Sequence, residues 1–232
     1  MSRGKLFFLA VILLIVVGGG FALRLLRSSN KPIISTEDQI AEVTRQIESG
    51  RISAEEGSKR LCSITARREE ERQVAVDSII DFSEDPQLLL EYQCNNYSPS
   101  RPADKPTREI YIGNGIIYTV SIASGTVLEV DTRGLKWILE PDGNRNLTPQ
   151  DKLPTYSQTE MEVMVRNFIV KHLPGVDLDS FEATQGKKDS NYFFRWENTT
   201  RDTEGKEKAH IQVGLTSNGQ LLNYYNSISQ SN

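Results

Sequence analysis

Hydrophobic residues recur with three different spacings along this chain, and the changes of spacing mark its predicted parts. Residues 6–23 are apolar throughout, apolar positions from 36 to 97 follow helical spacing, and most of those from 108 to 228 alternate with period two. The pattern predicts an α+β fold: an N-terminal transmembrane helix, a helical hairpin region, and then an antiparallel sheet with a packed helix. The predicted segments are an anchor (1–27), a helical region (28–97), a linker (98–107) and an α+β domain (108–228).

The apolar run at residues 6–23 carries no charge and follows Arg3 and Lys5. As a helix it would be about 27 Å long, close to the thickness of the hydrocarbon core of a bilayer. A cleavable signal peptide is the alternative, with residues 20–22 (GFA) as the processing site, but its apolar region is usually shorter. We therefore expect a single-pass membrane protein with residues 28–228 outside the cytoplasm, and secretion after cleavage as the alternative.

Residues 28–97 are predicted to form helices after a short polar tether. Capping-box patterns start at Thr36 and Ser53, and they predict one helix that ends at Gly50 and a longer one that extends to Ile80. Asp85 followed by proline predicts a further short helix that carries the second cysteine.

Cys62 and Cys94 are the two cysteines of the chain. In an exported protein they can pair, and they would then close a loop of about 30 residues and stabilise the fold by about 3–4 kcal/mol. Two buried free thiols are the alternative, which a cytosolic location would favour. Their spacing does not fit a metal site, and we expect no metal or cofactor.

Residues 98–107 (SPSRPADKPT) contain three prolines and no periodic apolar positions. This composition is typical of an extended linker. We expect the boundary between the helical region and the α+β domain here.

Beyond the linker, the alternation predicts a three-stranded meander over residues 110–122, 127–130 and 135–139, followed by a helix that begins after Ser157 and ends before Pro174. Strands at 192–197, 211–215 and 221–225 complete the chain. The hairpin with Tyr118, Val120 and Ile122 aligns with the one that has Ile211, Val213 and Leu215, and the second turn is one residue longer. An αβββ unit used twice explains this similarity; two unrelated hairpins with generic glycine turns are the alternative.

The C-terminal stretch resembles a known family in residues 192–197 (YFFRWE) and 212–224 (QVGLTSNGQLLNY). It is similar to PepSY and YcdB-type modules, which occur in peptidase propeptides and in membrane-anchored or secreted bacterial proteins. The resemblance implies a cystatin-like helix on an antiparallel sheet, and a role in binding or restraining a peptidase or another envelope protein. It supplies no catalytic residues, and residues 216–219 (TSNG) lack the acidic residue that the family usually has before its turn.

Candidate chemistry is sparse in this sequence. His172 stands in the last turn of a predicted helix, where the helix dipole favours a cation, and His210 is expected at a surface or strand edge. Neither has a nucleophile or an orienting acid marked by spacing. Asp177, Asp179 and Asp189 are more simply read as loop residues than as cation ligands. The net charge of −4 with scattered basic residues argues against nucleic-acid binding.

Tyr192, Phe194 and Trp196 alternate along one predicted strand. They are the candidate partner surface, although period-two aromatic residues more often fill the core face of a sheet. We therefore expect a non-enzymatic, membrane-anchored binding or regulatory protein whose partner is another envelope protein. An envelope hydrolase with a carboxylate pair, which has no local signature, and a structural spacer or assembly subunit are the alternatives.

Overall fold

The computed structural model describes residues 35–98, 105–132, 137–143, 145–146, 155–199 and 208–228. The chain divides into two compact units, residues 1–42 and 43–232. The predicted anchor at residues 6–23 lies outside the described ranges and stays a prediction. Within those ranges no helix is both long and apolar enough to cross a bilayer.

The first described element is α2 (Thr36–Glu48), which spans the boundary between the two units. Its first turn is closed by Ser35, whose Oγ accepts a hydrogen bond from Asp38 N at 3.1 Å. The helix predicted here is therefore present, but its cap is Ser35 rather than Thr36. Gly50, at φ +69°, follows the helix as expected for a C-terminal glycine.

The second predicted helix is two helices, α3 (Ala54–Thr65) and α4 (Glu69–Ser83). Ser53 caps α3 as predicted, because its Oγ accepts a hydrogen bond from Glu56 N. The chain becomes extended at Ala66 and helical again after Arg68, whose backbone N–H donates to the Glu71 carboxylate. The single helix that was predicted to extend to Ile80 is therefore interrupted here, and Arg68 begins a new one.

The helix predicted around Cys94 is wrong, because this segment is strand β1 (Glu91–Asn95) and pairs with β2 (Arg108–Gly113). Asn96 closes the connection between them: its Oδ1 accepts hydrogen bonds from Thr107 N and Arg108 N at 2.8 and 2.9 Å. The proline-rich stretch 98–107 therefore joins two neighbouring strands of one sheet and does not separate two domains. Proline-rich composition indicates a loop, but it does not distinguish a strand connection from a domain linker.

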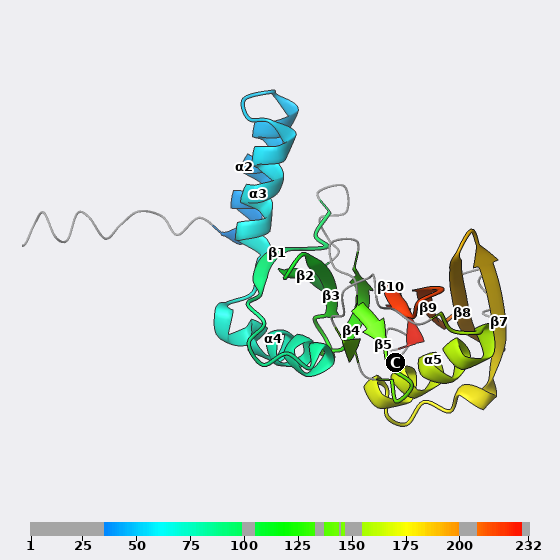
Figure 1. Cartoon of the computed structure of the whole chain (residues 1–232). Coiled ribbons are helices and arrows are strands. Elements are labelled where there is room, and N and C mark those ends of the chain that lie inside the picture. The colour runs from blue at the N-terminus through cyan, green and yellow to red at the C-terminus, as the bar shows by residue number, and fades with distance from the viewer. Residues whose placement is uncertain are drawn as a thin grey trace, which may run out of the picture. The chain divides into compact units, whose positions relative to one another are not determined.

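Residues 43–232 are built around one antiparallel sheet, in which eight strands follow the order β1-β2-β3-β4-β10-β9-β8-β7 (Figure 1). Beside this path, β5 pairs with β10 and β6. The bounds of the remaining elements are β3 (Ile116–Ser121), β4 (Val127–Asp131), β5 (Trp137–Leu139), β6 (Arg145–Asn146), α5 (Gln158–His172), the short 3₁₀ helix η2 (Leu178–Ser180), β7 (Phe181–Lys188), β8 (Asn191–Asn198), β9 (His210–Thr216) and β10 (Gln220–Asn226).

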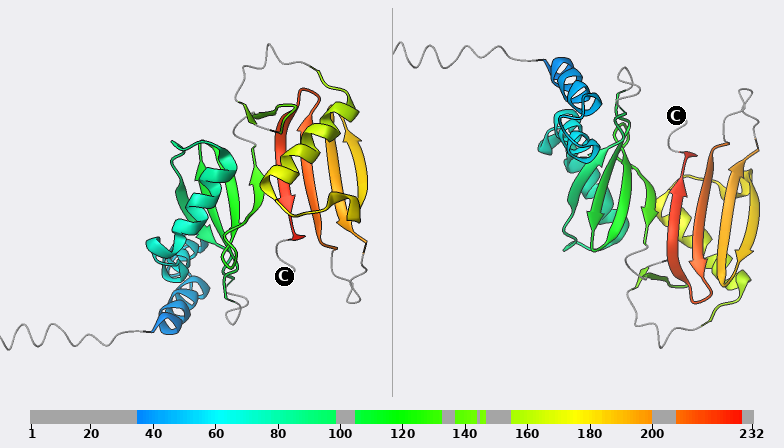
Figure 2. Two further views of the ribbon diagram at one scale, coloured as in Figure 1. Left: turned by 90° about the horizontal axis from the view of Figure 1, so that it is seen from below. Right: turned by 90° about the horizontal axis from the view of Figure 1, so that it is seen from above.

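Residues 43–232 contain the same repeat twice, and each repeat is one helix followed by four strands of the sheet. α4 precedes β1 to β4 and α5 precedes β7 to β10, and both helices have 15 residues and cover the same face of the sheet (Figure 2). The last strand of each unit, β4 and β10, pairs with the other at the centre, where Val130 lies opposite Tyr224. The repetition predicted from the sequence is therefore present, with four strands in each unit instead of three.

Each of the two repeats has a bulge in its last strand, and these bulges show which residues of one repeat correspond to which residues of the other. Leu128 is the extra residue of β4 and Leu222 that of β10, since the pairing skips each of them. Counted from these bulges, Tyr118 corresponds to Val213 rather than to Ile211. The alignment of these first strands made from the sequence is therefore wrong by two residues.

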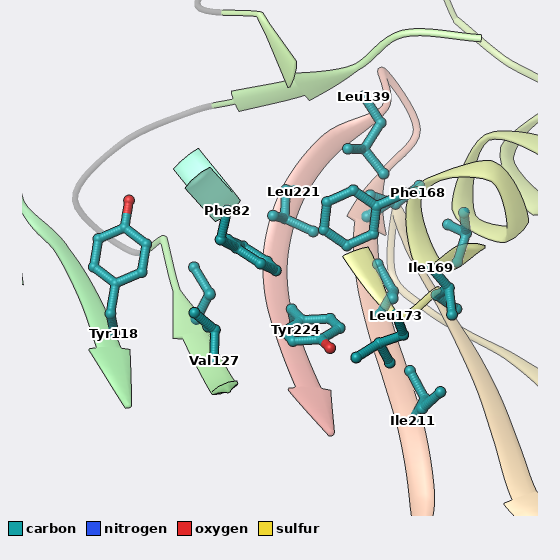
Figure 3. Packing of buried hydrophobic residues seen from close by; sticks show 14 of the residues in the cluster. Phe82, Tyr118, Val127, Leu139, Phe168, Ile169, Leu173, Ile211, Leu221 and Tyr224 are labelled. Atoms are coloured by element: carbon teal, nitrogen blue, oxygen red, sulfur yellow. The ribbon is translucent and has the colours of Figure 1, made fainter. Parts of the chain in front are cut away.

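The hydrophobic core is continuous across the two repeats of residues 43–232 (Figure 3). Phe82 of α4, Phe168 of α5 and Tyr224 of β10 meet with ring centroids 5.3–5.8 Å apart. Because such aromatic contacts add to the burial of apolar area, they tie the two helices to the central strand.

Candidate interaction surface

The aromatic residues predicted as a partner surface mostly lie inside the protein. Phe194 and Trp196 of β8 are each 1% exposed and belong to the core, and the Arg166 guanidinium of α5 lies 5.5 Å from the Trp196 ring. Tyr192 is half-buried at the margin, where Lys187 Nζ lies 5.0 Å from its ring centroid. The candidate surface is thus corrected: these positions form the helix-facing side of the strand, the alternative that period-two aromatic residues favoured.

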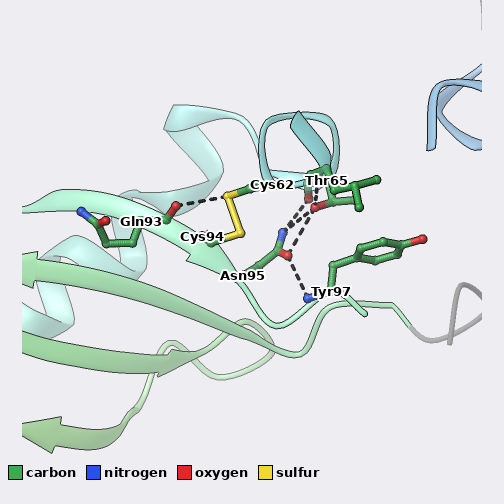
Figure 4. Close-up of a disulfide and its surroundings, with 7 residues drawn as sticks. Cys62, Thr65, Gln93, Cys94, Asn95 and Tyr97 are labelled. Atoms are coloured by element: carbon green, nitrogen blue, oxygen red, sulfur yellow. Dashed lines mark hydrogen bonds between the residues drawn. A yellow bond between two sulfur atoms is a disulfide. The ribbon is translucent and has the colours of Figure 1, made fainter. Parts of the chain in front are cut away.

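Cys62 and Cys94 form a disulfide, with their Cα atoms 5.3 Å apart (Figure 4). It joins α3 to the edge strand β1 rather than one helix to another. Beside it Asn95 Nδ2 donates a hydrogen bond to Thr65 O at 2.9 Å, so a second contact holds the same two elements together. This pair of contacts fixes the start of the first repeat.

Neither histidine has the surroundings of a catalytic base. His210 is only 4% exposed, which corrects the expectation of a surface position; its ring stacks on Tyr225 and its Nδ1 lies 3.0 Å from Lys208 O. Ser227 Oγ lies 3.5 Å from that nitrogen but accepts a hydrogen bond from His210 N at 2.8 Å, so it ties β9 to the end of β10. This contact is structural.

His172 lies at the end of α5, beside a cavity of about 240 Å³ between α4, α5 and the β3–β4 turn. Its ring packs between Phe82 and Phe168, with centroids 4.5 and 4.6 Å away. Lys171 Nζ binds Glu84 Oε1 at 2.8 Å, and His172 Nε2 lies 3.7 Å from the same oxygen. Lys171 and His172 therefore connect the C-terminal end of α5 to the C-terminal end of α4.

Two of the three aspartates considered as cation ligands make a backbone hydrogen bond and an ion pair. Asp177 accepts a hydrogen bond from Asp179 N at the start of η2, and Asp179 binds Arg166 Nη1 at 3.1 Å. Among the residues that the structure describes, no group of three or more possible metal ligands is gathered.

The side of the sheet opposite α4 and α5 is here called the open face, and its residues alternate along each strand with those of the core; Thr119 and Gly214 on this face are also buried. Strand pairing places five residues of this face in one row across β3, β4, β10, β9 and β8: Ile117, Asp131, Asn223, Gly214 and Phe193. The next row holds Thr119, Glu129, Tyr225, Gln212 and Arg195. The surface therefore mixes aromatic, aliphatic and polar side chains over both units.

Gly214 lets two side chains of the open face lie close to the sheet. A Cβ atom at this position would come within 2.9 Å of the Phe193 ring and 2.8 Å of Asn223 Oδ1. Asn223 Oδ1 is buried there and accepts no hydrogen bond within the described part of the chain. Phe193 and Arg195 alternate with Tyr192, Phe194 and Trp196 along β8, and this alternation is the sequence signal that places them on the opposite side of the strand.

Comparison with known proteins leaves the family open. No family model matches the chain, and no curated protein matches it. Among solved structures it is similar to the Bacillus megaterium YpeB C-terminal domain, with a TM-score of 0.42 and 11% sequence identity over 70% of this chain. The chain spans 63% of the length of that structure.

Proposed function

We propose that this chain is a non-enzymatic, membrane-attached protein of the cell envelope whose α+β unit binds another envelope protein through the open face. The observation that carries the proposal is that both helices pack on the other side of the sheet, while Phe193, Ile117 and Tyr225 stand among polar side chains on this one. Aromatic anchors with a polar surround are typical of interfaces between proteins that also exist apart.

We infer the cellular location of the protein from two features. The uncharged run at residues 6–23 is long enough for one membrane span, and the pairing of Cys62 with Cys94 suits an oxidising compartment. We therefore infer a single-pass membrane protein with residues 28–228 outside the cytoplasm.

The class of partner follows from the resemblance to PepSY and YcdB-type modules in residues 192–197 and 212–224. These modules accompany peptidases, so a peptidase of the envelope is the partner that we infer. Its contact segment would offer an apolar side chain to Phe193, which lies over Gly214.

The test measures binding with the intact chain. Tagged full-length protein in detergent is used to isolate its membrane partner, which is then purified and titrated against variants. Phe193→Ala should raise Kd about tenfold or more, which corresponds to a loss of about 1.4 kcal/mol at a buried aromatic anchor.

Val170→Ala is the matched control, because Val170 is a large apolar residue that is 55% exposed on α5, away from the open face. Its Kd should equal that of the unmodified chain. Equal affinities for all three proteins, or a larger effect of Val170→Ala, would contradict the proposal.

A further inference from the structure

Strand β7 is the last of the eight strands along the main path of the sheet, and its outer edge is unpaired within the described part of the chain. Its bounds are Phe181 and Lys188, every residue after Phe181 is exposed, and its pairing partner is β8. In an antiparallel ladder only alternate residues bond the neighbouring strand, so every second residue of β7 turns its backbone N–H and C=O toward solvent. A strand of this length with such an edge is able to accept a further strand.

We propose that β7 pairs antiparallel with β7 of a second copy of this chain, with Gln185 opposite its own copy. A two-fold axis perpendicular to the sheet requires one residue of the strand to face itself. With Gln185 at that point, Glu182 of each copy lies opposite Lys188 of the other. Two opposite-charge pairs therefore form across the same interface.

The neighbouring registers lack this complementarity. If Thr184 faces itself, Glu182 lies opposite Gly186, and if Gly186 faces itself, Lys188 lies opposite Thr184. Neither arrangement pairs opposite charges within the strand. Charge thus selects the register centred on Gln185.

The charged side chains of Glu182 and Lys188 on β7 are available for ion pairs with a second copy of the chain. Neither Glu182 nor Lys188 has an ion-pair partner within the ranges that the structure describes. Glu182 instead lies opposite Glu197 of β8, which already binds Arg195 at 3.1 Å. Lys188 from a second copy would therefore approach two carboxylates on the open face.

Small residues and the position of α5 leave room for the second strand. In this register Thr184 faces Gly186 of the other copy, and an added Cβ at Gly186 would meet nothing within 4 Å. On the helix side, Gln185 bonds Gln158 and Glu162. The nearest helix therefore reaches β7 through side chains and packs on β8, one strand further in.

Cysteine cross-linking of the full-length chain in detergent tests the register. In Gln185→Cys the two new sulfurs belong to directly opposed residues, whose Cα atoms lie about 4.5–5.5 Å apart, within the span of a disulfide. Ala183→Cys and Lys187→Cys are matched controls, since each lies about 14 Å from its own copy, four residues along the strand. Oxidation should produce covalent dimers of the first variant alone.

Charge reversal tests the pairing independently. Glu182→Lys or Lys188→Glu alone should raise the dimer dissociation constant at least tenfold in sedimentation experiments, and the double variant should restore it. A monomer at all concentrations, equal cross-linking of the three cysteine variants, or a double variant no better than the single ones would overturn the proposal. Because charged edge residues also prevent strand pairing, a monomer would assign them that role, and partner binding through Phe193 would be unaffected.

Discussion

Arg67 grips Glu109 with two parallel hydrogen bonds, from Nε to Oε1 at 2.9 Å and from Nη2 to Oε2 at 2.6 Å. The Glu109 side chain is 1% exposed, and Tyr111 donates a third hydrogen bond to it at 3.0 Å. Arg67 lies in the extended segment between α3 and α4. The pair thus links the helical region to the first repeat.

We predict that Arg67→Ala lowers the free energy of unfolding by about 3–5 kcal/mol, since it leaves a buried carboxylate without its partner. Urea unfolding followed by circular dichroism measures the loss. The neighbouring Arg68 pairs with Glu71 at the surface, so Arg68→Ala should leave the midpoint nearly unchanged. Equal midpoints for the two variants would contradict a buried role for Arg67.

Alkaline pH should weaken the fold through buried tyrosines, of which Tyr111 and Tyr224 are the main ones. Burial raises the pKa of Tyr111, with the negative charge of Glu109 as a further cause, and burial likewise raises the pKa of Tyr224. A raised folded-state pKa means that the neutral phenol stabilises the fold fully below the unfolded-state pKa of about 10 and that this contribution is lost as the pH rises beyond it.

The free energy of unfolding, measured between pH 8 and 12, should therefore fall above about pH 10. Tyr224→Phe removes one of the tyrosines whose pKa is raised, so its slope above pH 10 should be smaller than that of the unmodified chain. An unchanged slope in this variant would exclude Tyr224 as a cause.

The disulfide joins Cys62 to Cys94, which are 32 positions apart in the sequence. Its removal in Cys62→Ser combined with Cys94→Ser should lower the free energy of unfolding by about 3–4 kcal/mol through the larger entropy of the unfolded chain. Thermal unfolding with and without reductant provides the comparison: the reductant should lower the midpoint of the unmodified chain and leave that of the double variant unchanged. A response of the double variant to reductant would point to another cause.

Gly143 lies against the backbone of α5. It has φ +82°, and an added Cβ would approach Phe168 N to 2.7 Å. Gly175 has φ +95° with nothing within 4 Å, so Gly175→Ala reports backbone strain alone. We predict that Gly143→Ala lowers the free energy of unfolding in urea by about 1–3 kcal/mol more than Gly175→Ala does, because the added methyl group also displaces α5. An equal loss of unfolding free energy in the two variants would contradict a tight contact between Gly143 and α5.

The periodic parts of the chain were predictable from the sequence, and the parts that depend on pairing were not. The α+β class, the helix after Ser157 and the repeated hairpin follow from local patterns, and Ser157 caps α5 with Glu160 as expected. The Asn114-Gly115 turn was overlooked, although positive φ angles of 50° and 77° are typical of that dipeptide. It divides one predicted strand into β2 and β3.

β7 was missed for a physical reason. Its residues after Phe181 are exposed, so no alternation of apolar and polar residues marks it. β1 was taken for a helix because its identity depends on pairing with β2 across a proline-rich connection. For the candidate surface, alternation assigns Tyr192 and Phe193 to opposite sides of β8 and favours the core for the aromatic stripe, and the burial of Phe194 and Trp196 against α5 confirms that alternative.

Site-specific photo-cross-linking in living cells tests the open face most directly. A photoreactive phenylalanine analogue replaces Phe193 in one variant and Val170 in another, and both residues are accessible on different sides of the same unit. We predict that the analogue at position 193 forms a single covalent adduct with one envelope protein and that the analogue at position 170 forms none with it. The same adduct from both positions, or from position 170 alone, would contradict binding through the open face.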